Sequence, residues 1–416
     1  MSPELLAYPF LFIAIFFESF VLVTFLSAPA REARARKAAD IRDPHLPRVA
    51  IVVPCLNEGE TVAATIESIL ALRYPKDRLE VILVDNGSTD TTPEVMARYA
   101  GYPQVKVLAV TERGKHHAVN AGIMATAADL VGCLDADSFV EPDALLEIIP
   151  TFANPSVAAT VAAIAVHKPD SLLRHMQNAE YTIGILLRHI LASVNGLHVT
   201  PGPFSIYRRE VIVSLGGFRE GHQTEDLEMA LRLQEAGHWI ENAPRARVYT
   251  KTPATLPKLI RQRMRWTSGF LRNVGQEYRG LVFNPMHGAL GMIVLPLGFL
   301  AIASGILIFC LFVFQLMSNA IVAIELRAGI PAAYAWLPHS SHLDWFYLPS
   351  NMYILLGAAA VIGSMTMLTI GKRVSRTPGS LVTGVLVFIF LYGLIAPLWL
   401  MRATADVALG KKRTWS

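Results

Sequence analysis

Short apolar runs alternate with amphipathic segments through the middle of this chain. Four runs rich in Val, Ile, Leu and Ala have the length of buried strands: residues 49–54, 79–84, 105–109 and 130–134. Segments with apolar residues at helical spacing lie between them, at residues 61–70, 92–99 and 116–127. Strands that alternate with helices at this spacing predict a largely parallel sheet covered by helices, that is, an α/β domain.

Four longer apolar blocks flank this region, at residues 9–26, 290–317, 352–370 and 381–400. Each reaches or approaches the roughly 20 residues that a helix needs to span a bilayer. No A-x-A-like cleavage site follows the first block, so we expect a retained anchor rather than a signal peptide. Hydrophobic residues make up 53% of the 416 residues and charged residues 17%. Soluble domains carry roughly 25% charged residues, so the composition also favours a membrane protein.

Two polar helical segments lie between the α/β region and the later apolar blocks. Residues 171–194 have helical periodicity but carry Arg174, Glu180 and Arg188, so we expect this helix to lie at the membrane surface. Residues 258–270 predict a basic helix. The predicted organisation is an anchor (1–28), a basic linker (29–47), an α/β domain (48–250), interface helices (251–289), a membrane region of three spans (290–402) and a basic tail (403–416).

Basic residues orient the predicted spans. A cluster of Arg and Lys at residues 31–37 follows the first span, which by the positive-inside rule places the next domain in the cytoplasm and the N-terminus outside. Three trailing spans then keep the basic loop at 372–376 in the cytoplasm but put the basic tail at 411–413 outside. We expect three trailing spans, and the alternative is a further crossing within residues 319–338.

Charge and cysteine content exclude two other classes of protein. The formal net charge of +4 is too small to indicate a nucleic-acid partner. Cys55 and Cys133 lie at predicted strand ends and Cys310 lies inside a predicted membrane helix, so the three cysteines suggest neither a disulfide framework nor a zinc site.

Polar residues follow each of the four predicted strands. These residues are Asn57 and Glu58, Asp85, Glu112 to Lys115, and Asp135 with Asp137. Open α/β sheets bind ligands outside the carboxyl ends of their strands, so we expect a binding site at this edge. No G-x-G-x-x-G follows the first strand, which argues against a dinucleotide.

The last of these strand ends predicts a metal site. Asp135 and Asp137 stand two residues apart directly after a short buried strand. Proteins hold Mg²⁺ or Mn²⁺ with one or two carboxylates together with substrate phosphates, which suits such a pair. The alternative is that one aspartate only caps the helix that begins near Pro142.

Six motifs in order resemble one known family. They are Pro54-x-x-Asn57-Glu58, Val84-Asp85-Asn86-Gly87-Ser88-Thr89-Asp90, Gly114-Lys115 with Asn120, Asp135-Ala136-Asp137, Thr224-Glu225-Asp226 and Gln262-x-x-Arg265-Trp266. Over roughly residues 48–270 the set resembles the membrane-embedded family 2 glycosyltransferases, which include cellulose, chitin, hyaluronan and poly-N-acetylglucosamine synthases. One leading and three trailing spans resemble the nodulation chitooligosaccharide synthases. The resemblance implies a GT-A fold, a Rossmann-like domain with a mixed sheet.

The resemblance also implies roles for individual residues. The donor-binding positions would be Pro54, Asn57, Glu58, Asp85, Lys115 and Asp135. Asp137, with Asp135, would hold Mg²⁺ or Mn²⁺ at the diphosphate, and Asp226, beside Glu225, would be the general base. Two alternatives stay open, because Lys115 suits a solvated loop and Asp226 suits a helix cap.

The motif on the basic helix also has two interpretations. In the resemblance, Arg265 contacts the diphosphate and Trp266 stacks on the acceptor sugar. Gln262 precedes Arg265 by three residues and so lies on the same helix face. Alternatively, Arg265 and Trp266 anchor this helix to lipid headgroups.

These observations predict an inverting, metal-dependent membrane transferase. Its donor would be a UDP-sugar, UDP-GlcNAc or UDP-Glc, and its acceptor a growing β-linked glycan, extended processively and moved into the membrane. A partner subunit or a homo-oligomer would complete the channel. The alternatives are a single-addition transferase that glycosylates a lipid carrier, and a catalytically silent subunit for glycan transport or scaffolding.

Overall fold

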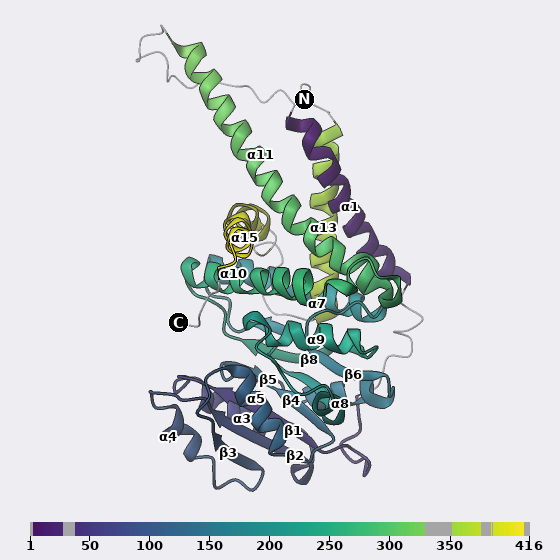
Figure 1. The fold of residues 1–416 in the computed structure, drawn as a ribbon, viewed down its shortest axis with the longest axis vertical. Coiled ribbons are helices and arrows are strands. Elements are labelled where there is room, and N and C mark those ends of the chain that lie inside the picture. The colour runs from purple at the N-terminus through teal and green to yellow at the C-terminus, as the bar shows by residue number, and fades with distance from the viewer. Residues whose placement is uncertain (1–2, 28–37, 329–351, 376–383, 385, 412–416) are drawn as a thin grey trace.

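The computed structural model describes residues 3–27, 38–328, 352–375, 384 and 386–411. An α/β domain forms one end of the molecule and long helices stand on the other side, with a layer of shorter helices between them (Figure 1). The basic cluster at 31–37 and the second half of the predicted alternative crossing at 319–338 lie outside the described residues.

One eight-stranded mixed sheet organises the domain, in the order β3-β2-β1-β4-β7-β6-β8-β5. The strands are β1 (Val49–Cys55), β2 (Leu79–Asp85), β3 (Val105–Ala109), β4 (Leu130–Cys133), β5 (Ser138–Val140), β6 (Val157–Val166), β7 (Ser205–Arg208) and β8 (Trp239–Thr250). The first four are parallel to one another, as predicted. The sheet is mixed because β7 runs antiparallel to both β4 and β6, and β5 antiparallel to β8.

The strands β1, β2, β4 and β6 are buried on both faces, which explains why they are largely apolar without alternation. The edge strand β3 is mostly exposed. The helices of the domain are α3 (Val62–Leu70), α4 (Thr92–Ala97), α5 (Lys115–Met124), α6 (Ala144–Ile148), α8 (Arg209–Ser214) and α9 (Glu225–Glu235). On β1, Ile51 belongs to one core cluster and Val52 to the other. Full burial of such a side chain is worth roughly 1.5–3 kcal/mol. At Gly122 a Cβ would lie 2.4 Å from Val52, so only glycine lets α5 approach β1 this closely.

Two helices are capped in different ways. Ser171 caps α7 (Leu172–Ser193), because its hydroxyl accepts a hydrogen bond from the backbone N–H of Arg174. Thr92 is the first residue of α4, and Thr91 holds the cap position without a side-chain cap bond of its own. Asp90 provides the capping acceptor instead, since its Oδ1 receives the backbone N–H of Thr92 at 3.0 Å.

The layer between sheet and membrane helices contains α7 and α10 (Leu256–Arg272), both predicted as polar helices (Figure 1). α7 contacts β6 and β8 on one side and the membrane helix α13 (Met352–Ser375) on the other. A π-helical turn, η4 (Asn273–Glu277), continues directly from α10. This layer therefore joins the two ends of the molecule.

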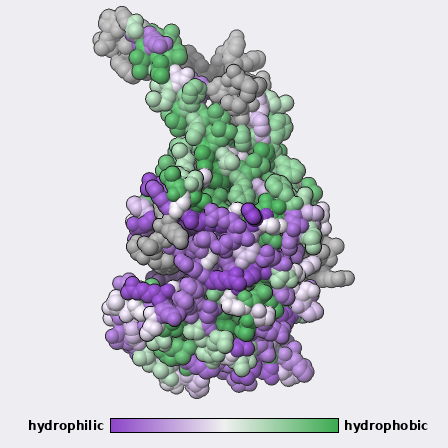
Figure 2. Space-filling view, viewed as in Figure 1, coloured by the Kyte–Doolittle hydropathy of each residue, from purple (hydrophilic) through white to green (hydrophobic). Residues whose placement is uncertain are grey.

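Three helices in the described parts of the chain are long and apolar enough to cross a membrane: Tyr8–Ser27, Leu290–Arg327 and Leu355–Ser375. They comprise α1 (Pro3–Ser27), the π-turn η7 (Leu290–Val294) with α11 (Leu295–Arg327), and α13. Their surface is apolar, whereas the domain below them is largely polar (Figure 2). The chain is thus a membrane protein, and its second apolar block extends ten residues beyond the predicted Met317.

The predicted last span, residues 381–400, falls partly outside the described residues and is not among these three helices. Its described part forms η9 (Phe388–Tyr392) and α15 (Gly393–Ala408). Ile395 and Trp399 of α15 pack with Leu259 and Met264 of α10. Figure 1 shows α15 nearly end-on beside α10, so it runs in a different direction from α1, α11 and α13.

Candidate functional site

The two aspartates after β4 lie where the chain turns into β5. Asp137 accepts a hydrogen bond from Ser138 Oγ at 3.1 Å. Burial, together with the nearby carboxylates of Asp135 and Glu58, raises the pKa of Asp137 to about 6. Crowded carboxylates of this kind are stabilised by a divalent cation, so the pair fits Mg²⁺ or Mn²⁺.

Such an ion would need further ligands. Among the residues that the structure describes, no group of three or more His, Cys, Asp or Glu side chains is placed to hold a metal. Two protein carboxylates with substrate phosphates and water are nevertheless an ordinary ligand set for Mg²⁺. The donor set of Asp135 and Asp137 therefore fits a metal that arrives with a diphosphate.

Lys115 connects this acidic pair to a second acidic site. Its Nζ lies 2.7 Å from Asp135 Oδ1 and 3.1 Å from Glu225 Oε1, and only 23% of its side chain is exposed. Burial disfavours the charged form, but the two carboxylates raise the pKa of Lys115 well above its ordinary value. Lys115 is thus a partly buried bridge and not the solvated loop lysine that was the alternative.

Gly202 makes room for this bridge and is not among the predicted site residues. A Cβ at Gly202 would lie 2.6 Å from Lys115 Nζ and 2.9 Å from the Asp135 carboxylate. The sequence indicates only a turn at Gly202-Pro203, because nothing in it shows which side chains the turn approaches.

Asp226 lies in the first turn of α9, beside Glu225. Burial and the Glu225 carboxylate raise the pKa of Asp226 to about 6, although Lys115 and Arg265 act in the opposite direction. Burial also disfavours the charged form of Glu225, but Lys115 lowers the pKa of this carboxyl below its ordinary value. The cap position belongs to Thr224, so the alternative that Asp226 is the helix cap is wrong.

The loops after β1 and β2 are bound to each other. Asn57, in the left-handed region at φ 56°, accepts the backbone N–H of Thr89 at 2.8 Å and donates its own to Ser88 Oγ at 3.0 Å. Glu58 donates its N–H to Thr92 Oγ1 at 2.7 Å. These bonds fix the predicted donor residues as one rigid edge.

Other predicted donor residues complete that edge. Pro54 is paired with Val84 across the parallel strands, and Asp85 accepts the backbone N–H of Ser88 at 3.2 Å. Burial and the Asp135 carboxylate raise the pKa of Glu58, which Thr61 Oγ1 contacts at 2.6 Å.

The predicted residues of the basic helix α10 have different surroundings. Arg265 lies close enough to the acidic turn of α9 to favour ionised Glu225 and Asp226. Trp266 is 38% exposed and one face of its ring is covered by Arg263, whose guanidinium carbon lies 4.1 Å from the ring centroid. Gln262 accepts a hydrogen bond from Arg263 at 3.2 Å. The predicted contact of Trp266 with a ligand is therefore restricted to the rest of its surface.

Arg263 is another site residue that is missing from the prediction. It is buried, and it donates to Glu180 of α7 at 2.7 Å while covering Trp266. Arg263 lies inside the Gln262-x-x-Arg265-Trp266 motif, and this position could have drawn attention to it. The sequence does not reveal its role, because its partner Glu180 lies more than eighty residues away.

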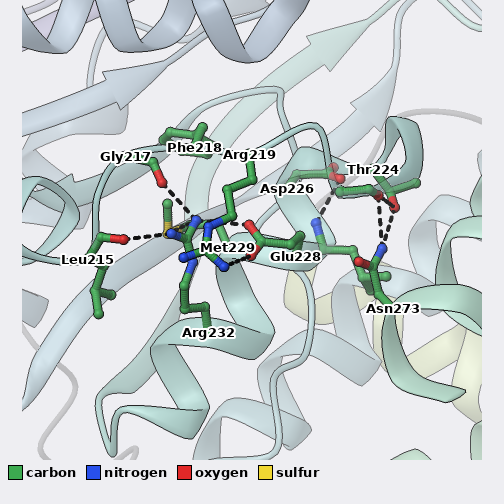
Figure 3. A network of polar contacts seen from close by, with 12 residues as sticks. Leu215, Gly217, Phe218, Arg219, Thr224, Asp226, Glu228, Met229, Arg232 and Asn273 are labelled. Carbon is green, nitrogen blue, oxygen red and sulfur yellow. Dashed lines mark hydrogen bonds and ion pairs between the residues drawn. The ribbon is translucent and has the colours of Figure 1, made fainter. Parts of the chain in front are cut away.

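A buried polar network holds α9 against its neighbours (Figure 3). Glu228 is fully buried and accepts from Tyr278 Oη at 2.5 Å and from Arg232 Nη2 at 2.8 Å. Arg232 also donates to the carbonyl groups of Leu215 and Gly217. Asn120, a residue of the Gly114-Lys115 motif, exchanges two hydrogen bonds with the backbone of Phe218 in the same loop.

Known proteins match the part of the chain that carries this site. Residues 47–269 match a family model described as "Glycosyltransferase like family 2". The poly-beta-1,6-N-acetyl-D-glucosamine synthase of Staphylococcus aureus (strain COL) is 31% identical over 239 residues, which are 56% of this chain and 57% of that protein. The Staphylococcus epidermidis enzyme of that name is 30% identical over 225 residues, 53% and 54% of the two chains. The chain thus spans about half the length of the curated relatives it matches.

A solved structure resembles nearly the whole fold. The mannosyltransferase of Pyrobaculum calidifontis, solved with GDP-Man and Mn²⁺, superposes with a TM-score of 0.55 at 22% sequence identity. The match covers 92% of this chain and 99% of that one, so the shared fold includes helices beyond the α/β domain.

Proposed function

This chain belongs to glycosyltransferase family 2 and is a glycosyltransferase, and we propose that it transfers a sugar from a UDP-sugar to a growing β-linked polysaccharide. The observation that carries the proposal is the Lys115 bridge. It joins Asp135, on the predicted metal and donor side, to Glu225, which adjoins the predicted base Asp226. A donor and an acceptor would therefore meet within one charged cluster.

On the donor side, Asp85 would bind the uracil or ribose, and Asp135 and Asp137 would hold Mg²⁺ or Mn²⁺. When bound, this metal neutralises charge on the departing diphosphate. Asn57 and Glu58 would keep the loop after β1 at the donor, because their backbone groups bind the loop after β2.

On the acceptor side, Asp226 would remove the proton from the attacking hydroxyl. A carboxylate with a pKa near 6 is ionised at neutral pH, yet it accepts a proton more readily than an ordinary aspartate. Direct attack at the anomeric carbon inverts its configuration, and one base suffices, with no carboxylate nucleophile. Arg265, near the same turn, would balance negative charge as the diphosphate leaves.

The proposal of a polymeric acceptor comes from α10 and from the relatives. Trp266 offers a partly exposed aromatic surface at the boundary between the domain and the membrane helices, and Gln262 lies on the same helix. The relatives named as poly-beta-1,6-N-acetyl-D-glucosamine synthases support UDP-GlcNAc as the first donor to test, with UDP-Glc second. The mannosyltransferase solved with GDP-Man makes that nucleotide-sugar the third.

The test uses the purified full chain in lipid nanodiscs with each radiolabelled donor and Mg²⁺ or Mn²⁺. We expect a ladder of products from a UDP-sugar and no turnover in chelator. A single labelled lipid without a ladder would favour the lipid-carrier transferase. The absence of turnover with every donor would favour the scaffold, and Asp226→Asn serves as the inactive control.

We also propose that the α/β domain faces the cytoplasm with the N-terminus outside. The apolar α1, α11 and α13 on one side of the domain support a single membrane-facing side (Figure 2). Reporter fusions at each terminus test the topology. With three trailing spans, a C-terminal reporter is expected to be active only outside the cytoplasm.

A further inference from the structure

The segment before the predicted base has an unusual backbone. Gly221, His222 and Gln223 have φ values of 52°, 52° and 67°, so three successive residues are left-handed. Two of them carry a Cβ, for which this conformation costs about 1–2 kcal/mol each. Such strain persists only where the surroundings hold it, and it concentrates at functional sites. Thr224-Glu225-Asp226 follows without a break.

Asn273 holds this left-handed turn. The side chain is fully buried, and its Nδ2 donates to Gly221 O at 2.9 Å and to Thr224 Oγ1 at 3.0 Å (Figure 3). A third acceptor, Gly269 O, lies at 3.0 Å. Asn273 Oδ1 is buried without a hydrogen-bond partner. The amide therefore keeps an orientation in which Nδ2 donates to the turn, although this orientation leaves its own oxygen unsatisfied at a cost in free energy.

Two more residues, at the end of α10 and in the segment after it, also contact this turn or Thr224. Gly269 allows close packing, because a Cβ there would lie 2.3 Å from Thr224 Oγ1. Glu277 lies 2.7 Å from His222 Nε2. Asn273 and Glu277 are the first and last residues of the π-turn η4, and π-turns inside helices often mark functional sites.

We infer that Asn273 is a positioning residue that holds the left-handed turn and thereby fixes Asp226 to α10. The position of Asp226 then depends on α10, which carries Arg265 and Trp266 at the proposed acceptor site. It does not depend only on the sheet that carries the donor loops. The inference rests on the proposed role of Asp226 as the base. It adds that the segment after the acceptor helix sets where that base lies.

The physical consequence is specific. Gly221 O still accepts a hydrogen bond from Thr224 Oγ1 at 2.7 Å, so the turn keeps its internal bond without Asn273. Without the Asn273 amide, the turn loses the hydrogen bonds that join it to the end of α10. We expect it to relax towards right-handed conformations, which moves the start of α9. A displacement of about 1 Å at a reacting group lowers a rate by roughly 100-fold. The loops after β1 and β2 are held by hydrogen bonds to each other, so we expect them to keep their positions. Turnover should fall while the affinity for the donor stays the same.

The test is a rescue experiment on the full-length enzyme in nanodiscs. Asn273→Ala is expected to lower kcat by about 10- to 100-fold with the Kd for the UDP-sugar unchanged within twofold. Gln223→Gly makes the left-handed conformation cheap, so the double variant Asn273→Ala/Gln223→Gly should recover a large part of kcat. Gln223→Ala removes the same side chain without freeing the backbone, and it should not rescue.

Each outcome decides the inference. Recovery with glycine and not with alanine supports it. Equal behaviour of the two double variants, or a parallel loss of donor binding in Asn273→Ala, overturns it and leaves Asn273 a packing residue. If Asn273→Ala does not fold, His222→Ala in the exposed His222–Glu277 contact replaces it, with the same rescue expected. Full turnover in Asp226→Asn would instead refute the proposed base, whatever the Asn273 variants do.

Discussion

The proposed donor side and the proposed acceptor side of this site are built in different ways. The donor side follows from parallel strands, because the ends of β1, β2 and β4 meet at one edge and short hydrogen bonds join their loops. The acceptor side is assembled across long sequence distances, where α9 meets the end of α10 through Gly269 and Asn273. Lys115 joins the two sides, because its ammonium group pairs with Asp135 on one side and with Glu225 on the other.

This difference determines what a mutation can change. A change on the donor side removes chemistry that every acceptor requires, since no sugar transfers without an activated donor. A change on the acceptor side leaves the donor bound and alters the position of the base or the hold on the glycan. The variants below separate these two sides, beginning with the largest expected effect.

Asp137→Ala tests the donor side. We expect turnover to fall by more than about 10⁴-fold, because the substitution removes a ligand of a metal whose charge stabilisation is worth several kcal/mol. Folding should be retained, as Asp137 lies at a strand end. The measurement is radiolabel transfer during a Mg²⁺ and Mn²⁺ titration. Asp143→Ala, at an exposed carboxylate paired with Arg73, is the control. Wild-type turnover of Asp137→Ala in chelator would remove the metal from the mechanism.

Asp226→Asn tests the acceptor side with a substitution that hardly changes the size and shape of the side chain. We expect turnover to fall by about 10²–10⁴-fold, the usual contribution of a general base, with donor affinity nearly unchanged. Donor binding by calorimetry and turnover by radiolabel transfer are compared in the same preparation. Glu235→Gln, at the exposed other end of α9, is the matched control. A comparable loss of donor binding would make Asp226 a donor ligand.

Lys115→Met tests the connection between the two sides. The substitution leaves the Asp135 and Glu225 carboxylates without their shared cation, so the KM for the donor should rise and kcat should fall, each by about tenfold. The lost charged hydrogen bonds should also lower the free energy of unfolding by about 1.5–3 kcal/mol. Lys106→Met, at a half-exposed lysine that pairs with Glu80, is the control. An effect on KM alone would assign Lys115 to the donor side only.

The sequence was a good guide to the donor side and a partial one to the acceptor side. The apolar runs predict β1 to β4 nearly residue by residue. For β1, β2 and β4 the reason is burial on both faces, which leaves a strong local pattern. Asp135, Asp137 and Asp85 can be located because they stand at the ends of those runs. Gly202 and Asn273 could not be found this way, since their roles depend on contacts with residues distant in sequence.

The pH dependence of transfer should also distinguish the two sides, with a smaller effect on the rate than these substitutions. Asp226 has a pKa raised to about 6, so the base is protonated below that pH and transfer should fall roughly tenfold at pH 5. The pKa of Asp137 is also raised to about 6, but a saturating metal keeps it ionised. The pH profile of kcat is therefore measured at saturating Mn²⁺. A flat profile between pH 5 and 7 would exclude Asp226 as the titrating base.

Trp266→Ala is expected to have the smallest effect on rate and the clearest effect on product. Arg263 covers one face of the ring and Trp266 stays 38% exposed, so the ring can still bind part of a sugar surface. A polymerising enzyme must hold its chain between additions, and loss of one stacking contact of about 1–2 kcal/mol would speed chain release by roughly 5- to 30-fold. The first transfer should slow by only a few-fold, because the proposed role of Trp266 is to hold the glycan and not to move a proton or bind the donor. Products are sized by gel electrophoresis with a limiting primer, and Phe283→Ala, at an aromatic residue that is 70% exposed, is the control. Unchanged product length with a slower first transfer would instead place Trp266 at the reacting sugar, and unchanged length and rate would leave it as an anchor of α10 to lipid.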